Sequence, residues 1–215
     1  MIGDLIQQQV WLGYGIAGGV LGSPVTQSRR IDAINPVGIV ISTTLPAAFD
    51  AVPAYKFGRP NLYSQAMWYA LIDGSLIKIG DYLLTGSGDT YFVAALQHLL
   101  PIGCVQCNRV LTVLRPASPA GFGSVGYGGD DVANEVPVMV SWPASMLTKS
   151  RGERNDVGLP GDVRMPWFEV LFPAFPGVDV LYGDVITDDH GRRYKISSAE
   201  LSDLGWRILA SLSMA

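Results

Sequence analysis

Short runs of apolar and β-branched residues, separated by Gly, Pro, Asp and Ser clusters, fill the chain from residue 37 onward. This pattern is typical of β-strands joined by tight turns. The first half has predicted strands at 37–42, 76–84, 90–96 and 105–114, and the second half at 136–142, 167–172, 178–186, 193–198 and 206–212. Short strands at this spacing favour antiparallel structure over a parallel α/β sheet. We therefore expect a mainly β protein with two tandem small β-barrels or sandwiches and a short N-terminal helical arm.

The two halves repeat the same residues at one constant shift. Gly74, Gly80, Asp81, Gly88 and Tyr91 recur in the second half as Gly177, Gly183, Asp184, Gly191 and Tyr194. Further matches pair Trp68-Tyr69 with Trp167-Phe168, residues 46–49 with 143–146, and residues 109–111 with 207–209. A duplicated catalytic site would repeat its reactive side chains, and the matched residues include none. The duplication indicates a structural protein that provides contact surfaces in an assembly.

In each copy the Gly-Asp pair opens a strand, a turn follows, and the tyrosine begins the return strand, which is a hairpin signature. Because a one-residue slip would turn every inward side chain outward, the preserved spacing predicts preserved strand pairing. We expect residues 37–116 and 136–215 to form two copies of one fold. Trp68 and Trp167 each begin an apolar strand after a long loop and are the predicted core anchors of the two copies.

The expected organisation is an N-terminal arm (1–35), a first β-module (36–116), a Gly-rich linker (117–134) and a second β-module (135–215). The arm predicts a short helix that begins near Asp4 and fades at Gly18-Gly19. Its apolar residues, including Trp11 and Tyr14, pack either on their own domain or on another subunit. Without the arm, both modules are expected to stay folded.

A second contact element is predicted in the loop 148–162. The loop holds Lys149, Arg151 and Arg154 beside Glu153 and Asp156, and it is too polar to bury itself. Mixed charges on a flexible loop suit a salt-sensitive contact at the rim of an interface.

Composition narrows the function classes. Charged residues make up 16% of the chain and hydrophobic residues 48%, which leaves a surface suited to neighbouring proteins. The net charge of −4 and the isoelectric point near 5.0 argue against sequence-specific nucleic-acid binding. Asp4 and the three glutamines at 7–9 interrupt the N-terminal apolar run, so we expect neither a secretory leader nor a membrane span. Synthesis in the cytosol follows.

Three sets of residues carry the alternative hypothesis of a hydrolase or metal enzyme. The run 121–126 matches a dinucleotide fingerprint, but more glycines and acids follow where a phosphate-binding helix should begin. Cys104 and Cys107 have half the spacing of a zinc site, yet on a strand they would point to opposite faces. His98 and His190 have no nucleophile nearby in sequence, and a turn explains Asp188-Asp189-His190. We expect no catalytic residue, cofactor or metal.

The motifs as a group resemble small virion proteins of tailed bacteriophages. In the first half these are Trp68-Tyr69-Ala70, Asp73-Gly74, Gly80-Asp81-Tyr82-Leu83, Tyr91-Phe92-Val93-Ala94, Leu100-Pro101-Ile102 and residues 105–109. In the second half these are residues 166–171, Gly183-Asp184-Val185-Ile186, Gly191-Arg192-Arg193-Tyr194 and residues 200–206. The second set is similar to β-barrel head-completion or head-tail joining proteins.

This resemblance implies a non-enzymatic neck protein that forms a ring below the portal. It implies portal, adaptor or tail proteins as partners, contact with further copies of itself, no membrane, and a place in the virion after assembly in the host cytoplasm. The duplication departs from the family, whose members carry one barrel. A tail hub, baseplate or fibre-attachment adaptor is therefore the alternative within the same class.

Overall fold

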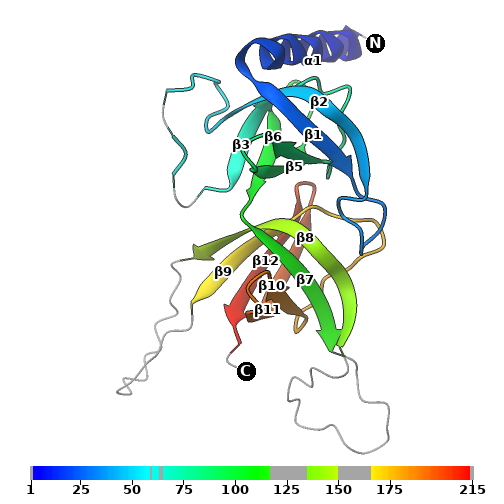
Figure 1. The fold of residues 1–215 in the computed structure, drawn as a ribbon, viewed down its shortest axis with the longest axis vertical. Coiled ribbons are helices and arrows are strands. Elements are labelled where there is room, and N and C mark those ends of the chain that lie inside the picture. Colours follow the sequence, from blue (N-terminus) through cyan, green and yellow to red (C-terminus); the bar gives the residue numbers. More distant parts are fainter. Residues whose placement is uncertain (1, 59, 63–64, 117–134, 150–165, 214–215) are drawn as a thin grey trace, which may run out of the picture.

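The chain folds into a helix and two β-barrels, one above the other in Figure 1. The computed structural model describes residues 2–58, 60–62, 65–116, 135–149 and 166–213. The mainly β fold class, with two tandem barrels and an N-terminal helix, is confirmed.

The first barrel closes six antiparallel strands in the order β1-β2-β3-β6-β5-β4. These strands are β1 (Ser23–Arg29), β2 (Ile39–Asp50), β3 (Met67–Leu71), β4 (Tyr82–Thr85), β5 (Thr90–Ala95) and β6 (Ile102–Cys107). β1 pairs with β2 on one side and with β4 on the other, which closes the barrel.

The second barrel has the same strand order, β7-β8-β9-β12-β11-β10. Its strands are β7 (Arg109–Pro116), β8 (Glu135–Lys149), β9 (Trp167–Phe172), β10 (Val185–Asp188), β11 (Arg193–Ser202) and β12 (Gly205–Leu212). β7 closes this barrel by pairing with β8 and β10, just as β1 does in the first. The internal repeat therefore encodes one barrel topology twice.

The repeated residues hold equivalent places in the strand registers. Tyr91 faces Leu83 across the β4–β5 hairpin, and Tyr194 faces Ile186 across the β10–β11 hairpin. The glycine before each repeated aspartate has a positive φ, 82° at Gly80 and 88° at Gly183. Glycine adopts this conformation at low cost, which explains its recurrence at this position.

The boundary between the copies differs from the predicted one. Strand pairing divides the chain at Asn108, so β7 belongs to the second barrel, and β1, inside the expected arm 1–35, belongs to the first. The stretch 117–134 connects two strands of one barrel and does not link modules. Glycine-rich composition marks a connection, but it does not say which strands the connection joins.

Two of the sequence matches are also corrected by the registers. Ala48 pairs with Leu71, and its counterpart Ser145 pairs with Leu171, so the counterpart of Trp68 is Phe168 and not Trp167. Residues 109–111 lie on β7, whose counterpart is β1, so their match with 207–209 on β12 is wrong. Trp68 is partly buried against the core of the first barrel. The fully buried tryptophan of the second barrel is Trp142, while Trp167 is only partly buried.

The outer face of β5 is buried against the second barrel. Tyr91 and Val93 belong to the core of the first barrel, whereas Phe92 and Ala94 belong to the cluster built mainly by the second barrel. Side chains alternate along a strand, so a strand covered on both faces has an unbroken apolar run. This requirement explains the apolar sequence of β5 and stacks the barrels end to end.

α1 (Ile2–Leu21) lies across the end of the first barrel that faces away from the second (Figure 1). Trp11 and Tyr14 pack against the first-barrel core. The helix continues through Gly18-Gly19, where the sequence predicted that it would fade. A Cβ at Gly18 would lie 2.5 Å from the carbonyl oxygen of Leu71, so glycine lets the helix approach the strands closely.

Candidate functional site

The repeated aspartates are structural residues at the centre of matching hydrogen-bond networks. Asp81 accepts hydrogen bonds from Arg29 Nε (2.7 Å), Arg29 Nη2 (2.6 Å), Gln27 Nε2 (2.7 Å) and the Lys78 amide (2.9 Å). The hydrogen bond with Asp81 raises the pKa of the Arg29 guanidinium. This carboxylate ties β1 to the turn before β4.

Asp184 forms the same network in the second barrel. Arg115 donates to it through Nε and Nη2, both at 2.9 Å, and the Leu181 amide donates at 2.8 Å. Arg115 on β7 is the counterpart of Arg29 on β1. Sequence reasoning missed both arginines because each lies far from its aspartate along the chain. The available signal was an arginine at or next to the end of the first strand of each barrel, Arg29 on β1 and Arg115 on β7.

The two cysteines occupy separate clusters, as the alternation along β6 predicted. Cys104 is fully buried inside the first barrel, and Cys107 packs against the cluster shared with the second barrel. Burial raises the pKa of the Cys104 thiol to about 12 and raises the pKa of Cys107 as well. Both thiols are free, and neither is poised to ionise near neutral pH.

The Asp188-Asp189-His190-Gly191 segment forms the β10–β11 turn. Asp188 accepts hydrogen bonds from the amides of His190 (3.0 Å) and Arg192 (2.8 Å) and from the hydroxyl of Tyr194 (2.9 Å). Burial raises the pKa of Asp188, but these hydrogen bonds lower it more, so the pKa lies below its usual value. The side chain of His190 contacts Arg109 on β7. The turn interpretation accounts for these residues.

Within the described residues, no group of three or more His, Cys, Asp and Glu side chains could hold a metal ion. His98 lies beside the start of α1, where a Cβ on Gly3 would be 3.4 Å from its Nε2. No described helix has the length and apolar character needed to cross a membrane. The run 121–126 lies outside the described residues.

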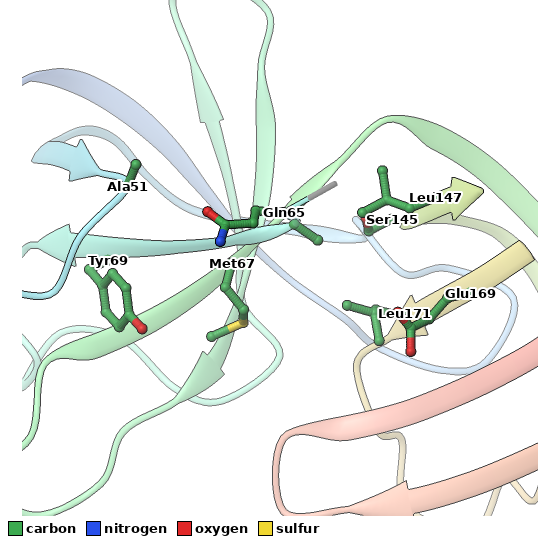
Figure 2. Close-up of a pocket in the computed structure, with 9 residues that line it drawn as sticks. Ala51, Gln65, Met67, Tyr69, Ser145, Leu147, Glu169 and Leu171 are labelled. Carbon is green, nitrogen blue, oxygen red and sulfur yellow. The ribbon is translucent and has the colours of Figure 1, made fainter. Parts of the chain in front are cut away.

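A cleft separates the two barrels on one side of the molecule (Figure 2). Its volume is about 320 Å³. Gln65, Met67 and Tyr69 line it from the first barrel, and Leu147 and Leu171 line it from the second. Glu169 at its wall forms an ion pair with Arg207 (2.6 Å), so the carboxylate is already engaged. The lining offers apolar contact and no grouping of reactive side chains.

The predicted interface residues fall in two places. Trp11 and Tyr14 pack on the first barrel of their own chain, which answers the question left open for the inner face of the arm. Lys149 ends β8, and Arg151 and Arg154 lie outside the described residues. The predicted rim contact of this loop therefore stays a prediction.

The outward face of α1 is apolar and exposed. Leu5, Leu12, Ile16 and Val20 follow one another at helical spacing on the side opposite Trp11, and Val20 is 78% exposed. The only charged residue of the helix is Asp4. Contiguous apolar stripes of this kind mark interaction sites more often than free surface.

Comparison with known proteins gives no match. No family model matches the chain, and no curated protein or solved structure is significantly similar to it. The function must therefore be argued from the residues and the fold.

Proposed function

We propose that this protein is a non-enzymatic structural component of a tailed bacteriophage particle, a head-to-tail connector or neck protein that assembles in a ring. The observation that carries the proposal is the exposed apolar stripe on α1. A helix that is apolar on two opposite faces needs cover on both, and the first barrel covers only one. The remaining face requires a neighbouring protein.

The duplicated barrel supports the proposal in a second way. The residues preserved between the copies are Gly-Asp turns, the arginine partner of each buried aspartate and a tyrosine, all of which maintain the barrel. A duplication that preserves structural residues suits a protein whose role is to provide contact surfaces for other proteins. The motifs of the second barrel resemble those of head-tail joining proteins, and for this reason we propose the neck as the position. A tail hub, baseplate or fibre-attachment adaptor is the alternative position.

The test is whether the protein is incorporated into particles through α1. Particles purified from the strain that carries the gene should contain the parent protein at a fixed copy number, measured by quantitative mass spectrometry. Ile16→Glu places a charge in the stripe and should lower incorporation by about tenfold or more. Ala54→Glu adds the same charge at an exposed position of the β2–β3 connection, away from the stripe, and should leave incorporation unchanged. Absence of the parent protein from purified particles would refute the proposal.

A further inference from the structure

The first half of β2 has an open edge. β1 pairs with β2 from Ile39 to Ala47, but on the other side β3 pairs only with Ala48, Phe49 and Asp50. Ile39, Val40 and Ile41 are exposed, as are Thr43 and Thr44 beyond them, and Val40 is 56% exposed. An uncharged, β-branched edge with unpaired backbone is a template for an added chain segment.

The second barrel shows what such an edge binds. The register places Val140 and Trp142 on β8 at the positions of Thr43 and Leu45 on β2. The carbonyl oxygen of Ala33, in the β1–β2 connection, accepts hydrogen bonds from the Val140 amide (3.0 Å) and from Trp142 Nε1 (2.6 Å). The connection between the first two strands of one barrel therefore caps the second strand of the next barrel.

This cap changes the exposure of the covered positions. Val138 and Val140 are partly buried and Met139 is buried, whereas their counterparts on β2 are Ile41 and Thr43, both exposed, and Ser42, partly buried. Among the described residues, no connection approaches β2 in the way that Ala33 approaches β8. The edge of β2 is thus open at positions whose counterparts on β8 are covered.

The repeat also identifies the counterpart of the cap. The β1–β2 connection covers residues 30–38, and its counterpart in the second barrel is the β7–β8 connection, residues 117–134, which is twice as long. At about 3.4 Å per extended residue, a connection of that length reaches at most roughly 30 Å from its barrel and back. Its sequence alternates glycine with Phe122, Val125 and Tyr127, which suits close backbone approach to an apolar edge.

The apolar face that stacks the first barrel on the second has no equivalent on the second barrel, so only the connection is left to make this contact. Phe92, Ala94 and Val105, which stack the first barrel on the second, have Lys195, Ser197 and Ser211 as counterparts in the second barrel. A second copy therefore has no matching apolar barrel face with which to extend the stack. A contact made by one connection alone is small and gains strength only when many copies close a ring.

We propose that the open edge of β2, from Ile39 to Thr44, binds the β7–β8 connection of a second copy of this chain. The inference rests on the proposed function, because it names the contact through which copies would meet in the ring. The contact joins different surfaces of the two copies, and such head-to-tail contacts generate rings when the rotation between copies closes.

Photo-crosslinking from the edge tests the proposal directly. The probe p-benzoylphenylalanine would replace Thr43, and the purified full-length protein would be mixed in equal parts with a ¹⁵N-labelled copy before irradiation. Mass spectrometry should find crosslinks between isotopically different copies, ending in residues 117–134. Crosslinks within one copy, to β2 or α1 of a second copy, or to no site at the highest soluble concentration would each overturn it.

A matched pair of variants gives an independent readout of oligomer mass by analytical ultracentrifugation. Ile41→Lys should abolish the concentration-dependent rise in mass, because a charge on an open edge blocks pairing. Leu84→Lys adds the same charge to β4, which is paired on both sides, and should leave the rise unchanged. Self-association through β2 by a protein absent from phage particles would refute the proposed function and leave this inference standing. Incorporation into particles with an unaffected Ile41→Lys variant would do the reverse.

Discussion

At the residue scale, the repeated aspartates connect sequence to fold most directly. Each carboxylate accepts a hydrogen bond from one backbone amide of a turn and pairs with the guanidinium of an arginine from an earlier strand. A buried carboxylate is tolerated only when it is paired and hydrogen-bonded in this way. The Gly-Asp pairs were visible in the sequence because they recur. Their partners were not visible, because two strands separate Arg29 and Arg115 from the aspartates along the chain.

Neutralising either aspartate should destabilise the protein. Asp81→Asn and Asp184→Asn each leave a guanidinium unpaired and turn an amide NH₂ toward buried donors, so we expect a loss of about 3 kcal/mol in the free energy of unfolding. Chemical denaturation monitored by tryptophan fluorescence measures it. Asp203→Asn, at an exposed position with one side-chain hydrogen bond, should change stability by less than about 0.5 kcal/mol. Equal losses of unfolding free energy at all three positions would show that the two aspartate networks contribute no more to stability than an exposed hydrogen bond.

The buried thiols predict a loss of stability at alkaline pH. The pKa of Cys104 is about 12 in the folded protein, above the value of roughly 8.5 for a free thiol, so folding favours the neutral form. This contribution is fully present below about pH 8.5 and is lost as pH rises toward 12. Burial likewise raises the pKa of Tyr91 to about 12. The denaturant concentration at the midpoint of unfolding should therefore decrease as the pH is raised from about 9 to 12. Ellman's reagent at pH 8 should label the thiols only after unfolding. Rapid labelling of the native protein would contradict the structural role.

At the scale of elements, the two faces of α1 differ: the inner face packs on the first barrel and the outer face is exposed. Trp11 fills a site where a Cβ on Gly74 would lie 2.4 Å from the indole, so its inner face is fitted to the barrel. The residues of the outer stripe are exposed. The sequence predicted the helix and identified Trp11 and Tyr14 as packing residues. It could not show which surface they contact, because that surface is formed by strands later in the chain.

Alanine substitutions should separate these faces. Trp11→Ala removes a partly buried indole and should cost about 2 kcal/mol of unfolding free energy, while Leu12→Ala should change it by less than about 0.5 kcal/mol. Thermal unfolding of both variants is the measurement. A larger cost for Leu12→Ala would mean that the outer stripe is already covered in the isolated protein.

The structure also corrects what the N-terminal arm contributes. β1 lies inside the arm and carries Arg29, so removal of residues 1–35 takes a strand out of a closed barrel. The sequence did not predict β1, because Ser23–Arg29 is polar and has no apolar alternation. Side-chain hydrogen bonds from Gln27 and Arg29, and pairing on both sides, hold it in place of apolar packing.

Two truncations should therefore behave differently. Removal of residues 1–21 deletes α1 alone and should leave the first barrel folded but less stable, whereas removal of residues 1–35 should unfold it. Circular dichroism and limited proteolysis would distinguish the two proteins. A stable first barrel after the longer truncation would show that β1 is dispensable.

At the scale of the whole molecule, the two barrels share one apolar interface. Tyr82 donates its hydroxyl to the carbonyl of Pro143 (2.9 Å), and its ring meets Trp142 edge-on with centroids 6.4 Å apart. The mainly β class and the duplication followed from sequence. The stacking did not, although the unbroken apolar run of β5 beside the alternating pattern of β11 was its signature. That contrast between counterpart strands could have identified the covered face.

The same contrast supplies the test of stacking. Phe92 is buried between the barrels, and its counterpart Lys195 is exposed on the second barrel. Phe92→Lys should bury a charge in the interface and cost at least about 3 kcal/mol, so calorimetry should show a lower and broader unfolding transition than the single transition expected of the parent. Lys195→Phe, the reciprocal change, should leave the transition close to that of the parent because this position is exposed. If Phe92→Lys melted like the parent, the barrels would have to be independent bodies, and the cap that Ala33 places on β8 could no longer serve as the precedent for the open edge of β2.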